Sequence, residues 1–228
     1  MPKEIIRMFL TFLALAILSV LPAHGASIRT HQKLIVLDSG HGGNDYGIQS
    51  PEGIRESQVA MELAKLTAAE LDETFKVLLT RTAEEQPIRT APPTRENRVA
   101  FANRHRADLF ISLHLHTRRA NDTYLFFFAP TTRPAPGSWQ ARSNLSLSQS
   151  KQMAKLAAEH FQEFSGGNIQ IRQAPASALE GLLMPGILIE PFSISQVPST
   201  PPDKKTFLSR YAQALARAIR NHFAGLGN

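Results

Sequence analysis

The sequence predicts an α/β fold of three layers, with helices on both faces of a mostly parallel or mixed sheet of about six strands. Two observations lead to this prediction. Short apolar runs rich in Val, Ile and Phe alternate along the chain with segments of helical periodicity, and loops rich in glycine or proline separate them. Such alternation is typical of a sheet that helices cover on both sides.

Six apolar runs have the length and composition of strands. In chain order they are Lys33–Asp38, Lys76–Arg81, Asp108–His114, Thr123–Ala129, Ile169–Arg172 and Gly186–Glu190. Two of these runs end in side chains that can take part in chemistry, namely His114 and Glu190.

Three segments carry apolar residues at helical spacing, and a fourth, short helix is expected between Thr94 and His105. The apolar positions are Val59, Leu63 and Leu66 in the first segment, Met153, Leu156, Ala157, His160, Phe161 and Phe164 in the second, and Leu208, Tyr211, Leu215 and Ile219 in the last. Residues that commonly cap helices precede them: Ser57, Thr94, Ser146 and Asp203. We also expect Ser146 and Gln149 to form a capping box.

The first residues predict export. Lys3 and Arg7 precede an apolar run from Met8 to Leu21, and small residues follow, which is the order found in a secretory signal peptide. The run is shorter than the roughly 20 apolar residues of a spanning helix, so an uncleaved anchor is the less favoured alternative. We expect residues 1–26 to be a signal peptide, residues 27–228 to form one domain, and the protein to be periplasmic or extracellular without a stable membrane span.

Composition narrows the partners and ligands. The 228 residues include no cysteine, which excludes disulfides and thiolate metal ligands. The formal net charge is +6 at pH 7, and the Lys and Arg residues are scattered along the chain. For an exported protein, an anionic envelope polymer or membrane surface is therefore a better partner than nucleic acid.

A glycine-flanked histidine follows the first predicted strand, in the motif DSGHGG at residues 38–43. Glycines permit a tight turn and leave the imidazole unshielded, so His41 can reach a metal at the mouth of the sheet. A flexible turn with an incidental histidine is the alternative. A phosphate-binding loop fits less well, because neither a Gly-Lys-Ser/Thr ending nor G-x-G-x-x-G spacing follows.

Four further residues stand where a site would form. Glu56 precedes a predicted helix, where a carboxylate either binds a metal or interacts with the helix N-terminus. His114 ends a buried strand, and His116 follows at a spacing that places both rings on one face if the strand continues. A buried histidine needs a hydrogen-bonding partner or a metal. Glu190 ends a central strand, where a carboxylate either transfers protons or has simply reached solvent.

Together these side chains match a catalytic zinc site. His41, Glu56 and His114 supply two imidazoles and a carboxylate, a fourth position stays open for water, and Glu190 is a second carboxylate that acts as base. Zn²⁺ fits this set of nitrogen and oxygen donors best, although Fe, Co or Mn can occupy the same groups in vitro.

The order of the motifs resembles that of the family 3 zinc-dependent N-acetylmuramoyl-L-alanine amidases of bacterial walls. The matching segments are Leu34–Gly43, Gly53–Glu56, Leu79–Arg81, Arg98–Asn103, Ala107–His114, Thr123–Tyr124 and Leu188–Glu190. The resemblance implies that residues 27–228 form an amidase-like catalytic domain in which His41, Glu56 and His114 bind Zn²⁺. It also implies that Glu190 polarises the attacking water and protonates the leaving amine. The bond cleaved would join N-acetylmuramic acid to L-alanine in peptidoglycan.

Two positions depart from the family pattern. His116 stands where the family has asparagine, and it either helps to bind substrate, competes for the metal or merely tolerates replacement. We take His116 and Arg81 as candidate substrate-binding residues. Phe192 stands where the family has glycine, and we expect it to narrow the cleft, while Pro191 removes a backbone donor.

Partners and rival functions complete the expectations. The sequence carries no recognisable wall-binding module, so a recruiting or activating protein is a candidate partner, and the loop Pro130–Ser143 is a candidate gate over the cleft. The sequence does not predict an oligomeric state. Two alternatives stay open: another zinc peptidase that acts on peptides, and a catalytically silent wall-binding or regulatory homologue.

Overall fold

The computed structural model describes residues 32–226 except 72, 84–93, 119–120, 129–134, 136, 139–140 and 142–144. The predicted signal peptide, residues 1–26, lies outside the described residues, as does most of the predicted gate Pro130–Ser143. Within the described part of the chain, no helix has both the length and the apolar character needed to cross a bilayer.

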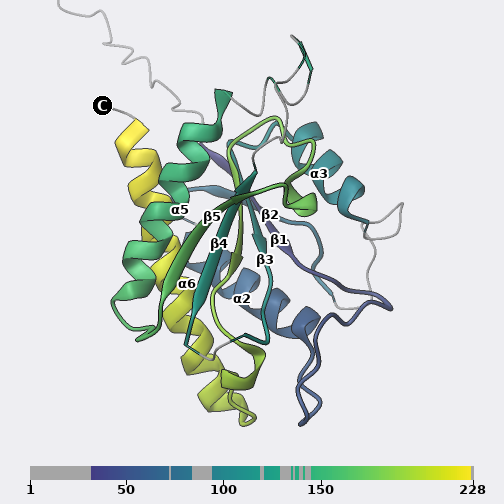
Figure 1. Cartoon of the computed structure of the whole chain (residues 1–228), viewed down its shortest axis with the longest axis vertical. Helices are drawn as coiled ribbons and strands as arrows, with labels where there is room; N and C mark the ends of the chain where they lie inside the picture. The colour runs from purple at the N-terminus through teal and green to yellow at the C-terminus, as the bar shows by residue number, and fades with distance from the viewer. Residues whose placement is uncertain are drawn as a thin grey trace, which may run out of the picture. The chain divides into compact units, whose positions relative to one another are not determined.

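Six strands form one mixed sheet (Figure 1). They are β1 (Leu34–Ser39), β2 (Lys76–Leu79), β3 (Leu109–Leu113), β4 (Thr123–Phe128), β5 (Ile169–Ala174) and β6 (Gly186–Glu190), and their order across the sheet is β2-β1-β3-β6-β4-β5. Neighbouring strands are parallel except β4 and β6, which pair antiparallel with Tyr124 opposite Glu190. The predicted sheet of about six strands is confirmed.

Helices lie on both faces of this sheet, as predicted. On one face are α2 (Glu56–Leu71), α5 (Leu147–Gln162) and α6 (Pro201–Leu226), and α6 packs against both of the others. On the other face, α3 (Arg95–Arg104) contacts the short 3-10 helix η1 (Ser177–Leu179). A second 3-10 helix, η2 (Ile194–Gln196), follows β6.

Alternate side chains of the central strands fill the cores on the two faces. Ile35 and Leu37 of β1 belong to the larger core, which includes side chains of α2, α5 and α6. Val36 belongs to the smaller core, with side chains of α3 and η1. All three are fully buried. Burial on both faces explains why these strands are nearly continuous apolar runs in the sequence.

The helix starts agree with the prediction at Thr94 and Ser146 and differ from it at Ser57 and Asp203. Thr94 caps α3 as predicted, and its side chain accepts a hydrogen bond from a backbone N–H of the first turn. Ser146 is the N-cap residue of α5, as predicted, but its side chain accepts no capping hydrogen bond, so the expected capping box with Gln149 is not formed. Ser57 lies inside α2. The last helix begins at Pro201, so Asp203 lies in its first turn. Proline favours the first helical position because its φ is preset and its missing N–H would have no helical partner there.

The reversal between β6 and β4 shapes one edge of the sheet. Because β1, β3 and β6 are parallel, they end at the same edge, and the antiparallel β4 begins there. The connection from β3 to β4, residues 114–122, therefore leaves and re-enters the sheet at this edge. Since β6 lies between β3 and β4, the connection passes the carboxyl end of β6.

Candidate metal centre and active-site groove

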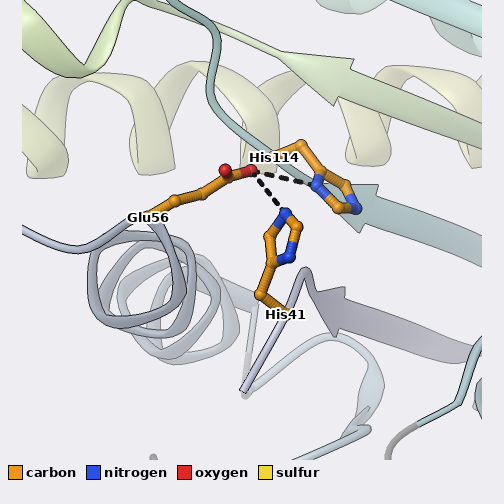
Figure 2. A group of neighbouring side chains, drawn as sticks. All are labelled: His41, Glu56 and His114. Carbon is orange, nitrogen blue, oxygen red and sulfur yellow. Dashed lines mark hydrogen bonds and ion pairs between the residues drawn. The ribbon is translucent and has the colours of Figure 1, made fainter. Parts of the chain in front are cut away.

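His41, Glu56 and His114 meet at the carboxyl edge of the sheet (Figure 2). His41 follows β1, Glu56 is the first residue of α2, and His114 follows β3. The Oε1 atom of Glu56 lies 3.2 Å from His41 Nε2 and 3.0 Å from His114 Nδ1. One possible ligand atom from each residue lies within 4.8 Å of the others. The structure therefore brings together the three ligands expected from the sequence.

The spacing of these atoms fits Zn²⁺. Zinc forms bonds of about 2.0–2.2 Å to histidine nitrogen and carboxylate oxygen, and tetrahedral angles then place ligand atoms about 3.3–3.6 Å apart. The distances from Glu56 Oε1 to the two imidazole nitrogens are only slightly shorter than this, and the three possible ligand atoms all lie within 4.8 Å of one another. Two imidazoles and one carboxylate, with a fourth position open, are the donors of a catalytic zinc site.

Backbone amides hold Glu56 in place. The N–H of Ile48 donates to Oε2, and the N–H of Leu115 donates to Oε1, both at 3.0 Å. Burial acts to raise the pKa of Glu56, but the hydrogen bonds from the two histidines and the two amides outweigh it and hold this pKa well below its ordinary range. Glu56 is thus an ionised carboxylate aimed between two imidazoles, as a metal ligand must be.

Asp45 orients His41, a role that the sequence analysis missed. Its Oδ2 lies 2.8 Å from His41 Nδ1, which leaves Nε2 facing Glu56. Burial acts to lower the pKa of His41, but the interactions with Glu56 and Asp45 raise it overall. A carboxylate behind a metal-binding imidazole fixes its tautomer and raises its basicity. The signal in the sequence was a carboxylate four residues after a glycine-flanked histidine.

Two glycines make room for the ligands. A Cβ added at Gly40 would lie 2.6 Å from His114 Nδ1, and a Cβ added at Gly47 would lie 2.6 Å from Glu56 Oε2. Gly47 also has a φ of +63°, which L side chains rarely adopt. These positions exclude side chains because the backbone approaches the metal ligands closely.

Two buried arginines hold the His41 loop from beneath. Arg98 donates to the carbonyl oxygens of Ser39 and His41. Arg81 donates to the carbonyl oxygens of Ser39 and Gly40. Arg81 is only 3% exposed, so its guanidinium supports the loop and does not face the groove as a substrate-binding residue would.

Asp38 provides the counter-charge for Arg98. Its carboxylate accepts hydrogen bonds from Arg98 Nη1, Thr80 Oγ1 and Ser112 Oγ, each at 2.7 Å. Burial acts to raise the pKa of Asp38, but the charge of Arg98 and the three hydrogen bonds lower it overall. Because the carboxylate accepts three hydrogen bonds and pairs with Arg98, neither charge is buried without a partner. The aspartate of the DSGHGG motif thus links β1 to β3 and α3 below the metal ligands.

His116 faces the interior. Its ring is buried, and its Nε2 donates to the carbonyl of Asp122 at 2.8 Å while its Nδ1 accepts the N–H of Arg118 at 3.1 Å. Burial lowers the pKa of His116, which agrees with a neutral ring protonated on Nε2. Both ring nitrogens are engaged with the backbone, so the structure gives His116 a role in shaping a turn and does not present it to substrate.

Glu190 ends β6, next to the strand that His114 follows. Both residues line an open cleft of about 260 Å³, together with Arg95 and Phe126. His114 and Arg95 also border a second cleft that contains His41 and Asp45. The two clefts share these residues, and we call them together the active-site groove.

Phe192 does not narrow this groove, contrary to the prediction. Its side chain is fully buried and packs on Phe207 and Tyr211, with ring centroids 4.8 and 4.6 Å away. The chain turns inward directly after Glu190, so the large residue contributes to the core beside α6. The carbonyl of the preceding Pro191 accepts a hydrogen bond from Thr123 Oγ1 at 2.8 Å.

Comparison with known proteins places this geometry in a family. The family model described as N-acetylmuramoyl-L-alanine amidase matches residues 35–221, which include all three ligands and Glu190. The N-acetylmuramoyl-L-alanine amidase AmiC of Neisseria meningitidis serogroup B is 25% identical over 240 residues, covering 88% of this chain and 55% of AmiC. The chain thus spans about half the length of this curated relative.

Solved structures share the fold. The catalytic domain of the amidase CwlV from Bacillus (Paenibacillus) polymyxa has a TM-score of 0.63 and 21% identity, with 85% of this chain and 99% of that domain covered. The CwlD amidase of Clostridioides difficile, in complex with the GerS lipoprotein, has a TM-score of 0.64 and 18% identity, with 85% and 100% covered. Since the family match extends from β1 into α6, the chain belongs to the N-acetylmuramoyl-L-alanine amidase family.

Proposed function

We propose that this chain is an exported, zinc-dependent hydrolase that cleaves the amide between N-acetylmuramic acid and L-alanine in peptidoglycan. The observation that carries the proposal is the cluster of three possible metal-ligating side chains, two of which, His41 and His114, line the same groove as Glu190. Membership of the amidase family supports the choice of scissile bond.

Each residue has a distinct part in this chemistry. His41, Glu56 and His114 would hold Zn²⁺, and Asp45 keeps the Nε2 atom of His41 directed at the centre. When bound, the ion supplies a Lewis acid and lowers the pKa of its water toward about 7. Glu190 lines the groove beside His114, where it accepts a proton from the attacking water and delivers it to the leaving amine.

Digestion of purified peptidoglycan by the zinc-loaded protein tests the scissile bond. We expect intact stem peptides with new L-alanine amino termini and a glycan that keeps its length. Shortened peptides still attached to glycan would instead indicate a peptidase. No cleavage of any kind would favour a catalytically silent wall-binding protein, and either result would overturn the proposal.

A pair of carboxylate substitutions tests the role of Glu190. Glu190→Ala should keep stoichiometric zinc, measured by elemental analysis, and lose at least about 100-fold in rate, because general acid–base catalysis contributes about that much. Glu180→Ala is the matched control, since Glu180 is exposed after η1 and the variant should keep full activity. Equal rates for Glu190→Ala and wild type would remove Glu190 from the mechanism.

Export and recruitment belong to the same proposal. Expression with residues 1–26 present should give a protein outside the cytoplasm whose N-terminus begins after Gly25 or Ala26, as N-terminal sequencing can determine. A recruiting or activating protein is supported by one structural neighbour, since CwlD was solved with the lipoprotein GerS. Addition of envelope extract should then raise the rate of the purified enzyme.

A further inference from the structure

Arg118 lies on the β3–β4 connection, beside the carboxyl end of β6. Its guanidinium donates a hydrogen bond to Glu190 Oε2. Its guanidinium carbon also lies 4.4 Å from the centroid of the Tyr124 ring. Because Tyr124 and Glu190 are opposite each other in the β4–β6 pair, the guanidinium contacts the ring and the carboxylate at the same time.

His116 holds the backbone of Arg118 in place. Its Nδ1 accepts the N–H of Arg118, and its ring stands edge to face on Tyr124 with the centroids 5.0 Å apart. Both His116 and Tyr124 are buried. A buried ring therefore holds the backbone of Arg118, and its guanidinium lies beside a second buried ring, that of Tyr124.

Arg118 has more donors than Glu190 uses. A guanidinium carries five N–H groups in a planar fork, whereas Glu190 is the acceptor that this side chain contacts among the described residues. The Arg118 side chain is 47% exposed, compared with 18% for Glu190. Donors therefore remain for a second anion that enters from the groove.

The surroundings of Glu190 carry an excess of positive charge. Arg172 of β5 lies 5.6 Å from the centroid of the Tyr124 ring, and Arg95 lines the groove together with Glu190. With Arg118, three guanidinium groups lie near Glu190 or the Tyr124 ring, against two carboxylates, Glu190 and Asp122, whose Oδ2 accepts a hydrogen bond from the Tyr124 hydroxyl. The site is thus suited to a substrate that brings its own carboxylate.

We propose that Arg118 is a specificity-determining residue that binds a free carboxylate on the residue following L-alanine in the stem peptide; this inference rests on the proposed function. Arginine binds carboxylates through charge-assisted hydrogen bonds in a fixed geometry. Glu190 acts at the scissile amide and contacts Arg118. An anion on the far side of the guanidinium therefore lies about 6–8 Å from that amide, a distance that about two extended residues span.

Two synthetic muropeptides test this proposal. They are identical except that the residue after L-alanine carries a free carboxylate in one and the primary amide in the other. For the zinc-loaded wild-type chain, we expect kcat/KM to be at least about tenfold higher for the free acid, because a hydrogen bond between charged groups is lost in the amide. Most of the difference should lie in KM.

Substitutions at Arg118 assign the preference to this side chain. Arg118→Gln should reduce the preference to near unity, and Arg118→Lys should keep part of it. Arg210→Gln is the matched control for loss of one positive charge, because Arg210 is exposed on α6, and it should keep the full preference. The melting temperature of each variant verifies that it is folded.

The outcomes separate this inference from the proposed function. If Arg118→Gln slows both substrates equally and keeps the preference, Arg118 serves only as a partner of Glu190, and the inference is overturned. Equal rates of the wild type on both substrates would overturn it too, while the amidase assignment would stand. Cleavage of neither substrate by the zinc-loaded wild type would overturn the proposed function and this inference together.

Discussion

Replacing Gly40 with alanine should displace a metal ligand without changing any ligand. The new Cβ would lie 2.6 Å from His114 Nδ1 and 2.7 Å from Nε2. The nearest ring atom, Cε1, would lie 2.4 Å away, and non-bonded atoms in contact stay about 3.5 Å apart, so the ring would have to retreat by about 1.1 Å. This is several times the tolerance of about ±0.2 Å for metal–ligand distances. Backbone strain has no part in the effect, because the φ of Gly40 lies outside the left-handed region.

We expect Gly40→Ala to lower zinc affinity by about 10–100-fold, the range seen when a ligand loses its orientation. At a zinc concentration of about 1,000 times the wild-type Kd, bound zinc stabilises the fold by about 4 kcal/mol, and a 100-fold weaker site would keep about 1.4 kcal/mol. Competition with a chromophoric chelator gives the affinity, and thermal unfolding with and without zinc gives the stabilisation.

Gly225→Ala is the control for this substitution. Its Cβ would meet only Gln152 Nε2, at 3.3 Å, which is the far end of a flexible side chain. Zinc affinity should therefore equal that of the wild type. If Gly40→Ala also binds zinc like the wild type, the reasoning that His114 is a ligand held against the Gly40 backbone is refuted.

Three other substitutions test the surroundings of the site. Asp45→Asn should weaken zinc binding by about 10–100-fold in the chelator assay, because His41 loses its orienting carboxylate. Asp38→Asn should lower the free energy of unfolding by about 3–5 kcal/mol in denaturant titrations, because Arg98 stays buried without a counter-charge. The pKa of Asp38 is lower in the folded than in the unfolded state, so its carboxylate contributes its full stability above the unfolded pKa of about 3.9. This stability is lost as the pH falls through the lower folded-state pKa. The asparagine variant should lack this loss of stability at acid pH. Phe192→Ala should cost about 3–5 kcal/mol of stability and leave KM nearly unchanged, and a large change in KM would contradict its place in the core.

The strands could be predicted from the sequence because both faces of the sheet are buried. Predicted and observed bounds coincide for β6, Gly186–Glu190, and differ by one residue at each end of β1. The antiparallel direction of β4 could not be predicted, because strand direction depends on how the chain crosses the sheet. Helix starts were predicted less well, since Ser57 and Asp203 are good capping residues that lie inside their helices.

The order of motifs was enough to propose the ligands, but the groups that support them act through the folded chain. Asp38 and Arg98 are 60 residues apart in sequence and form a buried ion pair beneath His41. Nothing local to Phe192 indicates that its side chain turns inward beside α6. The burial of Arg81, a candidate substrate-binding residue, could not be predicted for the same reason, since its backbone partners gather only when β1 and β2 pair.

The tip of the β3–β4 connection lies close to Glu190 but does not form part of the hydrophobic core. Thr117, Arg118 and Asn121 are exposed, yet Arg118 touches Glu190. Exposed substitutions usually change stability by no more than about 0.5 kcal/mol. If Arg118 binds the stem peptide as proposed, exchanges at Thr117, Arg118 and Asn121 should alter which wall chemistries are accepted, while the metal ligands, the sheet and its folding stay as they are.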